Sequence, residues 1–272
     1  MEELFDLMGK VIVITGAGGV LCGTMAKALA KIGAKVAVLD LNEAAAVKVV
    51  GDIKIGKGMA VAIKCDVLDK DSLKAAKERV NAEFGKVDIL INGAGGNKKE
   101  ATTSPDLPFF DLPLDTIRFV FELNFIGTLL TTQVFGKEMA KNDNGIILNI
   151  SSMNALRPLT KIPAYSAAKA AVNNFTQWLA VHMCQNYSKN IRVNAIAPGF
   201  FLTEQNRFLL TDEKTDELTA RGKAIIDHTP MTRFGQPEEL IGTVVWLLSD
   251  AAKFVTGIVV PVDGGFSAFS GV

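Results

Sequence analysis

The sequence predicts a single α/β domain built on a doubly wound parallel sheet, for three reasons. Short apolar runs rich in β-branched residues alternate along the chain with longer stretches of helical period. Most of these runs are apolar on both faces, as in central strands that helices cover from both sides. No linker, repeat or low-complexity tract divides the 272 residues, a length that fits one domain spanning residues 1–272. The expected strands are residues 10–15, 35–40, 60–64, 87–92, 145–151, 191–196 and 257–262.

The segments between the strands have helical character, apart from two irregular stretches. Repeated alternation of strand and helix implies right-handed crossovers and an open sheet flanked by helices on both faces. In such sheets, ligands bind beyond the carboxyl ends of the strands. We therefore expect residues 95–113 and 199–231, the latter with a polar helical part near 211–226, to border the site and cover the substrate. The expected helices are residues 24–32, 43–54, 70–84, 114–141, 164–187 and 237–248.

The charge balance and the cysteine count narrow the kind of protein. Lys+Arg and Asp+Glu both number 29, so no overall field attracts nucleic acid or an acidic membrane, and a small-molecule ligand is favoured. The acidic amino end is unlike a secretory signal, and no apolar run approaches the roughly 20 residues of a membrane span. Cys22, Cys65 and Cys184 fit reduced thiols, and His182 and His228 cannot by themselves make a metal cluster. We expect a cytoplasmic protein without nucleic-acid, membrane or metal partners.

A glycine-rich turn joins the first expected strand to the first helix. Glycines there let the backbone approach a pyrophosphate, which the amides and dipole of the helix can hold. Asp40 ends the second strand, 24 positions after Gly16, where its carboxylate can accept hydrogen bonds from ribose hydroxyls. Leu41 and Asn42 follow, and no neighbouring cation stands ready to pair a 2′-phosphate, so NAD is favoured over NADP. The alternative interpretation is that the glycine turn is purely structural and that Asp40 is a solvated acid. The spacing between the two favours the cofactor site. The expected cofactor-binding residues of this half are Gly16, Gly18, Gly19, Val20, Leu21, Asp40, Asp66, Val67, Asn92, Gly93 and Ala94.

Three residues in the second half form a catalytic constellation. Tyr165 and Lys169 are four positions apart in an expected helix, which places both on one face. An ammonium near a phenol stabilises the phenolate and lowers the pKa of the phenol. Ser152, at the end of the fifth strand, can offer its hydroxyl to a carbonyl oxygen. The Tyr–Lys pair alone could be an interfacial tyrosine beside a snorkelling lysine, but its combination with Ser152, Asp40 and the glycine turn indicates a catalytic site.

With these residues in place, the chain resembles the short-chain dehydrogenase/reductase family over essentially its whole length. Further matches are Asn124, Asn149, Pro198-Gly199 and the segment 262–265, VDGG. The resemblance implies one Rossmann-type domain, with a dinucleotide-binding half at about residues 1–150 and a catalytic, substrate-covering half at about residues 151–272. It also implies hydride transfer to or from a carbon that bears a hydroxyl or a ketone.

The family resemblance also implies a role for each matching residue. Tyr165 would be the acid/base, Ser152 would polarise the carbonyl, and Lys169 would lower the pKa of the tyrosine and hold the nicotinamide ribose. Asn124 would anchor a water that relays protons, and Thr203 would face the nicotinamide carboxamide or the phosphates. The cofactor-binding set then also includes Tyr165, Lys169, Pro198, Gly199, Phe201 and Thr203.

The glycine turn departs from the pattern usual in the family, T-G-x-x-x-G-x-G. A gapless match puts Val20 and Cys22 where two glycines are expected, and Gly18, Gly19 and Gly23 are shifted neighbours. The path of this loop over the pyrophosphate is therefore left open by the sequence.

Several segments resemble a narrower group within the family, the D-mannonate oxidoreductases (fructuronate reductases) of the short type. They are TGAGGVLCG, INGAGGN, ISSMNALRPLTKIPAYSAAKAAVNNFTQWLA, APGFFLTEQNR and PVDGGFSAFSGV. This resemblance implies interconversion of D-fructuronate and D-mannonate, with NADH reducing the ketone. Two alternatives stay open: a reductase of another polyol, gluconate or 3-oxoacyl thioester, and a catalytically idle NAD-binding scaffold or sensor.

A sugar-acid substrate needs a cation for its carboxylate and paired polar groups for its hydroxyls. Arg157 and Arg207 are the better candidates for the cation, because a lone lysine is more often a solvated surface charge. Phe200, Phe201, Phe208 and Leu209 keep a fatty-acyl or steroid pocket open. The candidate substrate-binding residues are Asn97, Lys98, Asn154, Arg157, Lys161, Gln205 and Arg207, with Glu204 and Asn206 beside them.

Apolar surface predicts self-association. The two long helices expected at 114–141 and 164–187, and a tail containing Phe266, Phe269 and Val272, would leave apolar side chains partly exposed in a monomer. We expect a homotetramer with two-fold axes, unless these faces pack only on the sheet.

Overall fold

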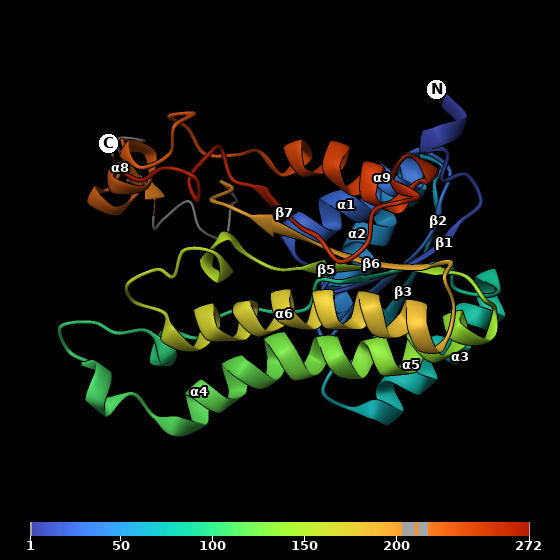
Figure 1. Cartoon of the computed structure of the whole chain (residues 1–272), viewed down its shortest axis with the longest axis horizontal. Coiled ribbons are helices and arrows are strands. Elements are labelled where there is room, and N and C mark those ends of the chain that lie inside the picture. The colour runs from blue at the N-terminus through green and yellow to red at the C-terminus, as the bar shows by residue number, and fades with distance from the viewer. Residues whose placement is uncertain (1, 203–209, 212–216, 272) are drawn as a thin grey trace.

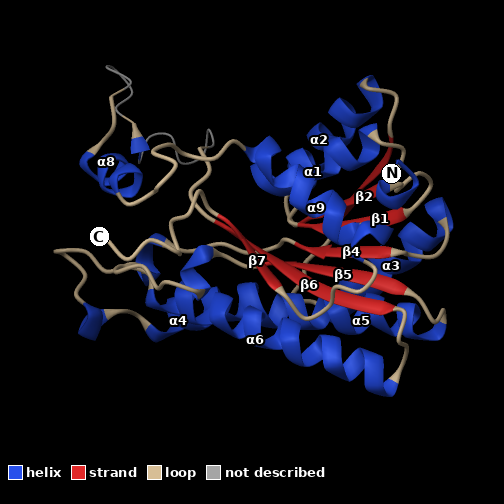
Figure 2. Cartoon of the chain, turned by 45° about the horizontal axis from the view of Figure 1, so that its top comes forward, coloured by secondary structure: helices blue, strands red, loops and turns tan. Residues whose placement is uncertain are grey.

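The computed structural model describes residues 2–202, 210–211 and 217–271, and it confirms the predicted α/β fold. Seven strands form one sheet in the order β3-β2-β1-β4-β5-β6-β7, and every neighbouring pair is parallel (Figure 2). The order reverses between β1 and β4, which opens a crevice at the carboxyl edge. The strands are β1 (Val11–Thr15), β2 (Lys35–Asp40), β3 (Met59–Lys64), β4 (Ile89–Asn92), β5 (Gly145–Ile150), β6 (Ile191–Pro198) and β7 (Val259–Val262).

Helices cover both faces of the sheet (Figure 1). One face carries α1, α2 and α9, and the other carries α3, α5 and α6. Segments 95–113, the carboxyl-terminal tail and α8 lie at the same end of the molecule. The helices are α1 (Val20–Lys31), α2 (Glu43–Ile55), α3 (Lys70–Phe84), α4 (Leu114–Phe121), α5 (Gly127–Lys141), α6 (Pro163–Asn186), α8 (Ala220–Asp227) and α9 (Ile241–Leu248).

The alternation of side chains along the central strand explains why there are two cores. Ile12 and Ile14 of β1 pack in the core with α1, α2 and α9, whereas Val11 and Val13 pack in the core with α3, α5 and α6. All five residues of β1 are buried. Successive strand side chains point to opposite faces, so a strand covered on both sides is buried at every position, and its first four residues here are apolar.

The predicted helix 114–141 is interrupted in the structure. A π-helical turn, Glu122–Ile126, separates α4 from α5 and carries Asn124. By length and composition the stretch Leu114–Lys141 could cross a membrane, although the sequence analysis expected no membrane span. Half of its most apolar window is buried inside the fold, as in a core helix. Several other bounds shift by a few residues, and the predicted helix 237–248 begins with a 3-10 turn, Pro237–Leu240, before α9. Helix α1 begins earlier because Gly19 is its N-cap, and β7 begins later because Gly257 has a positive φ of 80°.

The glycine turn follows a path that accommodates the cysteine of the unusual motif. Gly16 has φ 65°, and a Cβ there would lie 2.7 Å from the Cα atom of Ala94. A Cβ at Gly93 would overlap the Sγ atom of Cys22, which is buried in α1. Cys22 therefore fits where the family pattern has glycine because Gly93 has no side chain.

We predict that Gly93→Ala destabilises the fold by about 1–3 kcal/mol, because a methyl group would be forced into a filled space. In a Cys22→Ala background the cost should be smaller by about 1 kcal/mol, since the overlapping sulfur is gone. Recovery should be partial, because the carbonyl oxygen of Thr15 would still lie 2.7 Å from the new Cβ. Chemical denaturation of the four proteins measures both effects.

Gly51→Ala is the matched control, because nothing lies within 4 Å of a Cβ at this exposed helical position. It should leave stability unchanged or raise it slightly. An equal cost of Gly93→Ala with and without Cys22 would show that the two positions are not coupled.

Candidate active site

The carboxyl ends of five neighbouring strands bring the predicted site residues to one edge of the sheet. The glycine turn follows β1, Asp40 ends β2, Asp66 follows β3, Gly93 follows β4 and Ser152 follows β5. Because parallel strands end at the same edge, residues far apart in the sequence meet there.

The amino end of α1 has the features of an anion-binding site. Its N-cap, Gly19, offers no side-chain cap, and no acidic residue lies in the first turn. The amides of the first turn of a helix have no partner within the helix, so here they can receive phosphate oxygens. A Cβ at Gly18 would lie 2.9 Å from Oδ2 of Asp40, so a side chain at this position would displace the carboxylate.

Backbone amides orient the carboxylate of Asp40. The amide of Gly18 donates to its Oδ2 atom at 2.9 Å, and the amide of Asn42 donates to its Oδ1 atom at 2.8 Å. A carboxylate can accept about four hydrogen bonds, so both oxygens keep the capacity to accept from hydroxyl groups. This is the chemistry that a ribose diol requires.

Two further side chains shape the loops after β1 and β4. The hydroxyl of Thr15 accepts hydrogen bonds from the amides of Gly93 at 3.1 Å and Ala94 at 3.2 Å, a role that the sequence did not suggest. The side chain of Asn92 lies in the protein interior, where it donates to Thr132 at 3.0 Å and to Asn149 at 2.8 Å. The side chain of Asn92 therefore does not take the predicted cofactor-binding role, because it is engaged inside the fold.

The loop after β3 carries two further residues of the predicted cofactor set. The carboxylate of Asp66 accepts a hydrogen bond from the amide of Leu68 at 2.9 Å and is partly exposed. Val67 is buried, and its side chain fills the space beside Gly127 at the start of α5.

Tyr165 and Lys169 lie on the first turns of α6, one turn apart as predicted. Lys169 is buried, with its Nζ atom donating to the carbonyl oxygen of Ile150 at 2.8 Å and lying 5.6 Å from the centre of the Tyr165 ring. Burial lowers the pKa of Lys169 to about 8. Burial also raises the pKa of Tyr165, and a hydrogen bond with Ser152 acts in the opposite direction. In this arrangement the serine, rather than the lysine, is the group that favours the phenolate.

Asn124 meets this pair through the loop after β4. Its amide nitrogen donates to the carbonyls of Gly96 and Val120, both at 2.7 Å, and its Oδ1 atom accepts from the amide of Gly96 at 3.1 Å. A Cβ at Gly95 would lie 2.5 Å from Oδ1 of Asn124 and 3.2 Å from Nζ of Lys169. The π-helical turn therefore brings Asn124 against the loop that also borders the lysine, as π-helical turns often do at functional sites.

Several candidate substrate groups are engaged with other parts of the chain. The ammonium of Lys98 lies 3.7 Å from the centre of the Phe119 ring, and the amide of Asn97 donates to Thr102 at 2.9 Å. Nε of Arg157 donates to the carbonyl oxygen of Ser267 at 3.0 Å. The polar groups of Lys98 and Asn97 are therefore engaged within the chain, whereas only Nε of Arg157 is.

The remaining candidates divide between the cleft and the surface. Asn154 is buried beside Ser152, and its backbone amide donates to the hydroxyl of Ser152 at 3.2 Å. Lys161 is exposed. The amide of Gly199 donates to the carbonyl oxygen of Val262 at 2.9 Å, just after Pro198 ends β6. The predicted residues Thr203, Glu204, Gln205, Asn206, Arg207, Phe208 and Leu209 lie outside the described residues.

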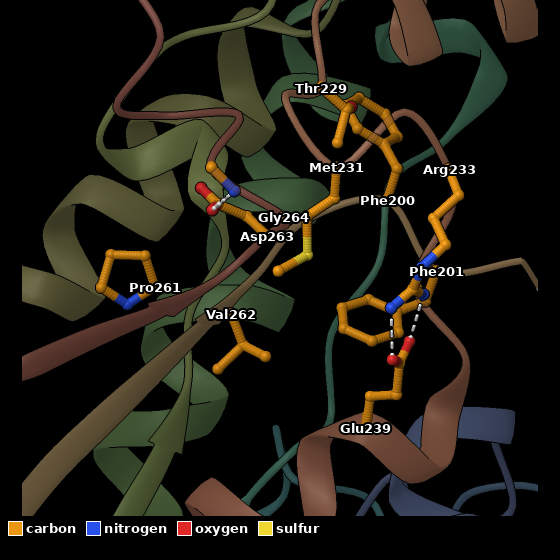
Figure 3. A pocket seen from close by; sticks show the side chains of 12 residues that line it. Phe200, Phe201, Thr229, Met231, Arg233, Glu239, Pro261, Val262, Asp263 and Gly264 are labelled. Carbon is orange, nitrogen blue, oxygen red and sulfur yellow. Dashed lines mark hydrogen bonds and ion pairs between the residues drawn. The ribbon is translucent and has the colours of Figure 1, made fainter.

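A pocket of about 360 Å³ lies beyond the ends of β6 and β7 (Figure 3). Phe200, Met231 and Val262 give it an apolar lining, and the buried ring of Phe201 closes one side. Neither Tyr165 nor Ser152 lines it, so the pocket is distinct from the catalytic constellation.

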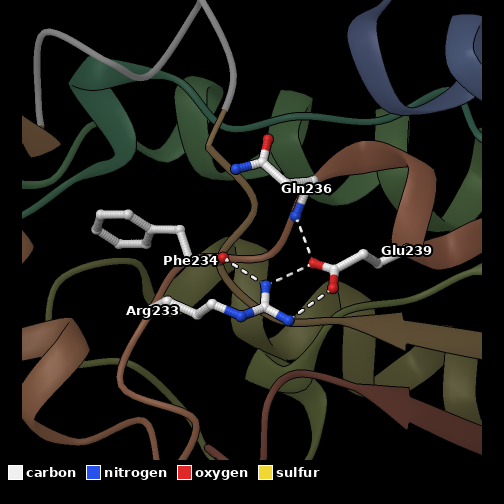
Figure 4. Close-up of polar contacts among 4 residues, drawn as sticks. All are labelled: Arg233, Phe234, Gln236 and Glu239. Atoms are coloured by element: carbon white, nitrogen blue, oxygen red, sulfur yellow. Dashed lines mark hydrogen bonds and ion pairs between the residues drawn. The ribbon is translucent and has the colours of Figure 1, made fainter.

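An ion pair that the sequence did not suggest lies on the wall of this pocket (Figure 4). Arg233 donates to both carboxylate oxygens of Glu239, at 2.6 and 2.7 Å, and to the carbonyl oxygen of Phe234 at 3.1 Å. Glu239 also accepts from the amide of Gln236 at 2.8 Å. These hydrogen bonds lower the pKa of Glu239 to about 2. The ion pair joins the loop that carries Arg233 to the turn just before α9.

Known proteins of similar sequence and structure share this architecture. A family model described as enoyl-(acyl carrier protein) reductase matches residues 19–267. The uncharacterized oxidoreductase UxuB of Bacillus subtilis (strain 168) is 51% identical, covering 98% of both chains. The 7alpha-hydroxysteroid dehydrogenase of Escherichia coli (strain K12) is 36% identical over 95% of this chain and 94% of its own, and the 5-keto-D-gluconate 5-reductase of that strain is 33% identical over 97% and 98%. A provisionally assigned D-mannonate oxidoreductase from Haemophilus influenzae, solved with bound NAD, superposes with a TM-score of 0.91 at 51% identity, covering 98% of each chain.

We predict that the wild type gains stability relative to Lys169→Met as the pH rises. Burial holds the pKa of folded Lys169 at about 8, against 10.5 for a solvated lysine. Between these values the unfolded chain binds a proton that the folded chain has released, so raising the pH stabilises the wild type by up to about 3 kcal/mol. The variant has no such proton. Denaturant unfolding of both proteins without cofactor, near pH 7 and near pH 10, measures the difference. An equal change in both proteins would contradict a depressed pKa for this lysine.

Proposed function

Because the chain belongs to the short-chain dehydrogenase/reductase family, we propose that it is an NAD-dependent oxidoreductase that interconverts D-fructuronate and D-mannonate. The observation that carries the substrate is the likeness to the Haemophilus influenzae structure, at 51% identity over 98% of both chains. The relatives named for steroid and 5-keto-D-gluconate substrates are less similar, at 36% and 33% identity. Oxidation of a CH–OH group is common to all of these assignments.

The residues at the carboxyl edge fit a bound NAD. The uncapped amino end of α1 would receive the pyrophosphate, and the carboxylate of Asp40 would accept from the adenosine ribose hydroxyls. Leu41 and Asn42 offer no cation to a 2′-phosphate, which supports NAD over NADP. When bound, NAD(H) supplies or accepts the hydride.

The catalytic residues would move the accompanying proton. In the reducing direction Tyr165 donates its phenolic proton to the substrate oxygen, and Ser152 donates a hydrogen bond to the same oxygen. The hydrogen bond of Ser152 favours the phenolate that remains. The ammonium of Lys169, held by the carbonyl of Ile150, would hold the nicotinamide ribose. Because its pKa is about 8, the lysine can release and take up a proton near neutral pH. Gly95 lies between this lysine and Asn124.

Arg157 is the described cation best placed to hold the substrate carboxylate. It follows Ser152 by five positions, and the carbonyl of Ser267 fixes its Nε atom. Within the described part of the chain, its two terminal nitrogens have no hydrogen-bond partner. A guanidinium held by one edge keeps its other edge for a bidentate contact with a carboxylate.

We predict that the wild type reduces D-fructuronate with NADH and that Arg157→Ala lowers kcat/KM for it by roughly 10- to 150-fold. This corresponds to about 1.5–3 kcal/mol for a charge-assisted hydrogen bond. The loss should shrink for a neutral ketose, because that substrate has no carboxylate to be held. Lys253→Ala, which removes an exposed cation of the Asp250 ion pair, is the matched control and should change neither rate.

The two parts of this prediction fail separately. Reduction of a 5-ketogluconate or a 7-oxosteroid without reduction of fructuronate would refute the substrate assignment. Turnover of fructuronate with an unimpaired Arg157→Ala would refute only the anchor.

We predict that Tyr165→Phe keeps NADH affinity but loses kcat by roughly 10²- to 10⁴-fold, as expected when a general acid is removed. The chain has two tyrosines, so Tyr187→Phe is a matched control. Tyr187 is exposed at the far end of α6 and its loss should leave kcat unchanged. NADH fluorescence titration and steady-state rates give the two readouts. Near-normal turnover by Tyr165→Phe would assign the proton transfer to another group.

A further inference from the structure

The catalytic constellation is assembled from two separate elements. Ser152 lies at the end of β5, whereas Tyr165 and Lys169 lie on α6. Residues 153–162 connect the two, and most of the middle of this connection is exposed. An exposed loop cannot by itself fix a hydroxyl relative to a phenol to within the roughly 0.5 Å that catalysis requires. Direct contacts between β5 and α6 must fix it.

Three consecutive residues at the end of β5 form hydrogen bonds with one face of α6. Asn149 donates to the hydroxyl of Thr176 at 2.9 Å, and the carbonyl of Ile150 accepts from Lys169 at 2.8 Å. The hydroxyl of Ser151 donates to Oδ1 of Asn173 at 2.5 Å. Residues 169, 173 and 176 are spaced by four and three positions, so they share a helix face, which Tyr165 continues one turn earlier.

The contact between Ser151 and Asn173 is the one adjacent to the catalytic serine. Ser151 is buried, and its hydroxyl also lies 3.4 Å from the carbonyl oxygen of Lys169. Its amide donates to the carbonyl of Ile196 in β6 at 2.8 Å. Ser151 is therefore held by the sheet on one side and by α6 on the other, and Ser152 follows directly from it.

We propose that Ser151 and Asn173 are positioning residues that hold the hydroxyl of Ser152 in register with Tyr165 and Lys169. This proposal rests on the catalytic roles given above. Neither residue needs to touch the substrate or NAD, so the pair acts through the placement of Ser152. A displacement of about 1 Å in a reacting group can lower a rate by as much as 100-fold.

The test compares Asn173→Ala, Ser151→Ala, the double variant and Asn173→Asp, which keeps an acceptor oxygen. We expect kcat to fall by roughly 10- to 100-fold in both alanine variants while KM and NADH affinity change by less than about 3-fold. The double variant should be no worse than either single variant, because both remove the same contact. Asn173→Asp should recover most of kcat.

Thr176→Val is the matched control on the same helix face. It removes the hydroxyl that accepts from Asn149 without changing the shape of the side chain, and it lies farther along α6 from Tyr165. We expect it to lower stability but not kcat. An equal loss of kcat in Thr176→Val and Asn173→Ala would reduce the pair to a structural contact and overturn the proposal.

A second readout does not depend on the substrate. In a Tyr187→Phe background Tyr165 is the one tyrosine left, so its ionisation can be followed by ultraviolet difference absorbance. The hydrogen bond with Ser152 lowers the pKa of Tyr165, so displacing Ser152 should raise it. Asn173→Ala should therefore titrate at higher pH than the parent, and Thr176→Val should not. Failure of the wild type to reduce fructuronate would refute the proposed function alone; an unshifted titration in Asn173→Ala would refute the positioning role.

Discussion

One buried ammonium group, that of Lys169, constrains the whole candidate site. The ammonium donates to the main-chain carbonyl of Ile150. It is almost fully removed from water, and this burial disfavours the charged form and lowers its pKa to about 8. Relative to a solvated lysine, this difference corresponds to about 3 kcal/mol of lost stability near neutral pH. Every folded molecule bears this loss of stability. Such a destabilising group is typical of a functional site, where activity depends on it.

The surroundings of this ammonium explain several neighbouring residues. Gly95 must lack a side chain, because a Cβ would lie 3.2 Å from the ammonium and closer still to Asn124. The π-helical turn places Asn124 on the other side of Gly95, which lies in the loop after β4. The carbonyl of Ile150, which accepts from the ammonium, belongs to the last residue of β5. The lysine thus lies where β5, α6 and the loop after β4 come together.

Much of the fold and part of the site follow from the sequence, because their physical signals are local. The first four residues of β1 are all apolar, which predicts coverage on both faces, and the four-residue spacing of Tyr165 and Lys169 predicts a shared helix face. The π-helical turn was missed because Leu114–Lys141 has an unbroken helical pattern. The Cys22–Gly93 pairing and the Arg233–Glu239 wall depend on loops meeting in space, for which one sequence carries no signal.

The same reasoning explains why the polar groups around the cleft were the hardest to assign. The sequence does not show whether a charged or amide side chain in a loop faces a substrate or another part of the chain. Lys98, for example, lies against the ring of Phe119. Arg157 differs because its partner is the carbonyl of Ser267, a residue of the tail that Asp263 orders by accepting the amides of Gly265 and Ser267. The edge of the candidate substrate site is therefore fixed by the carboxyl-terminal tail. Changes in the tail should reach Arg157 through one main-chain carbonyl, while the constellation on β5 and α6 is held by contacts of its own.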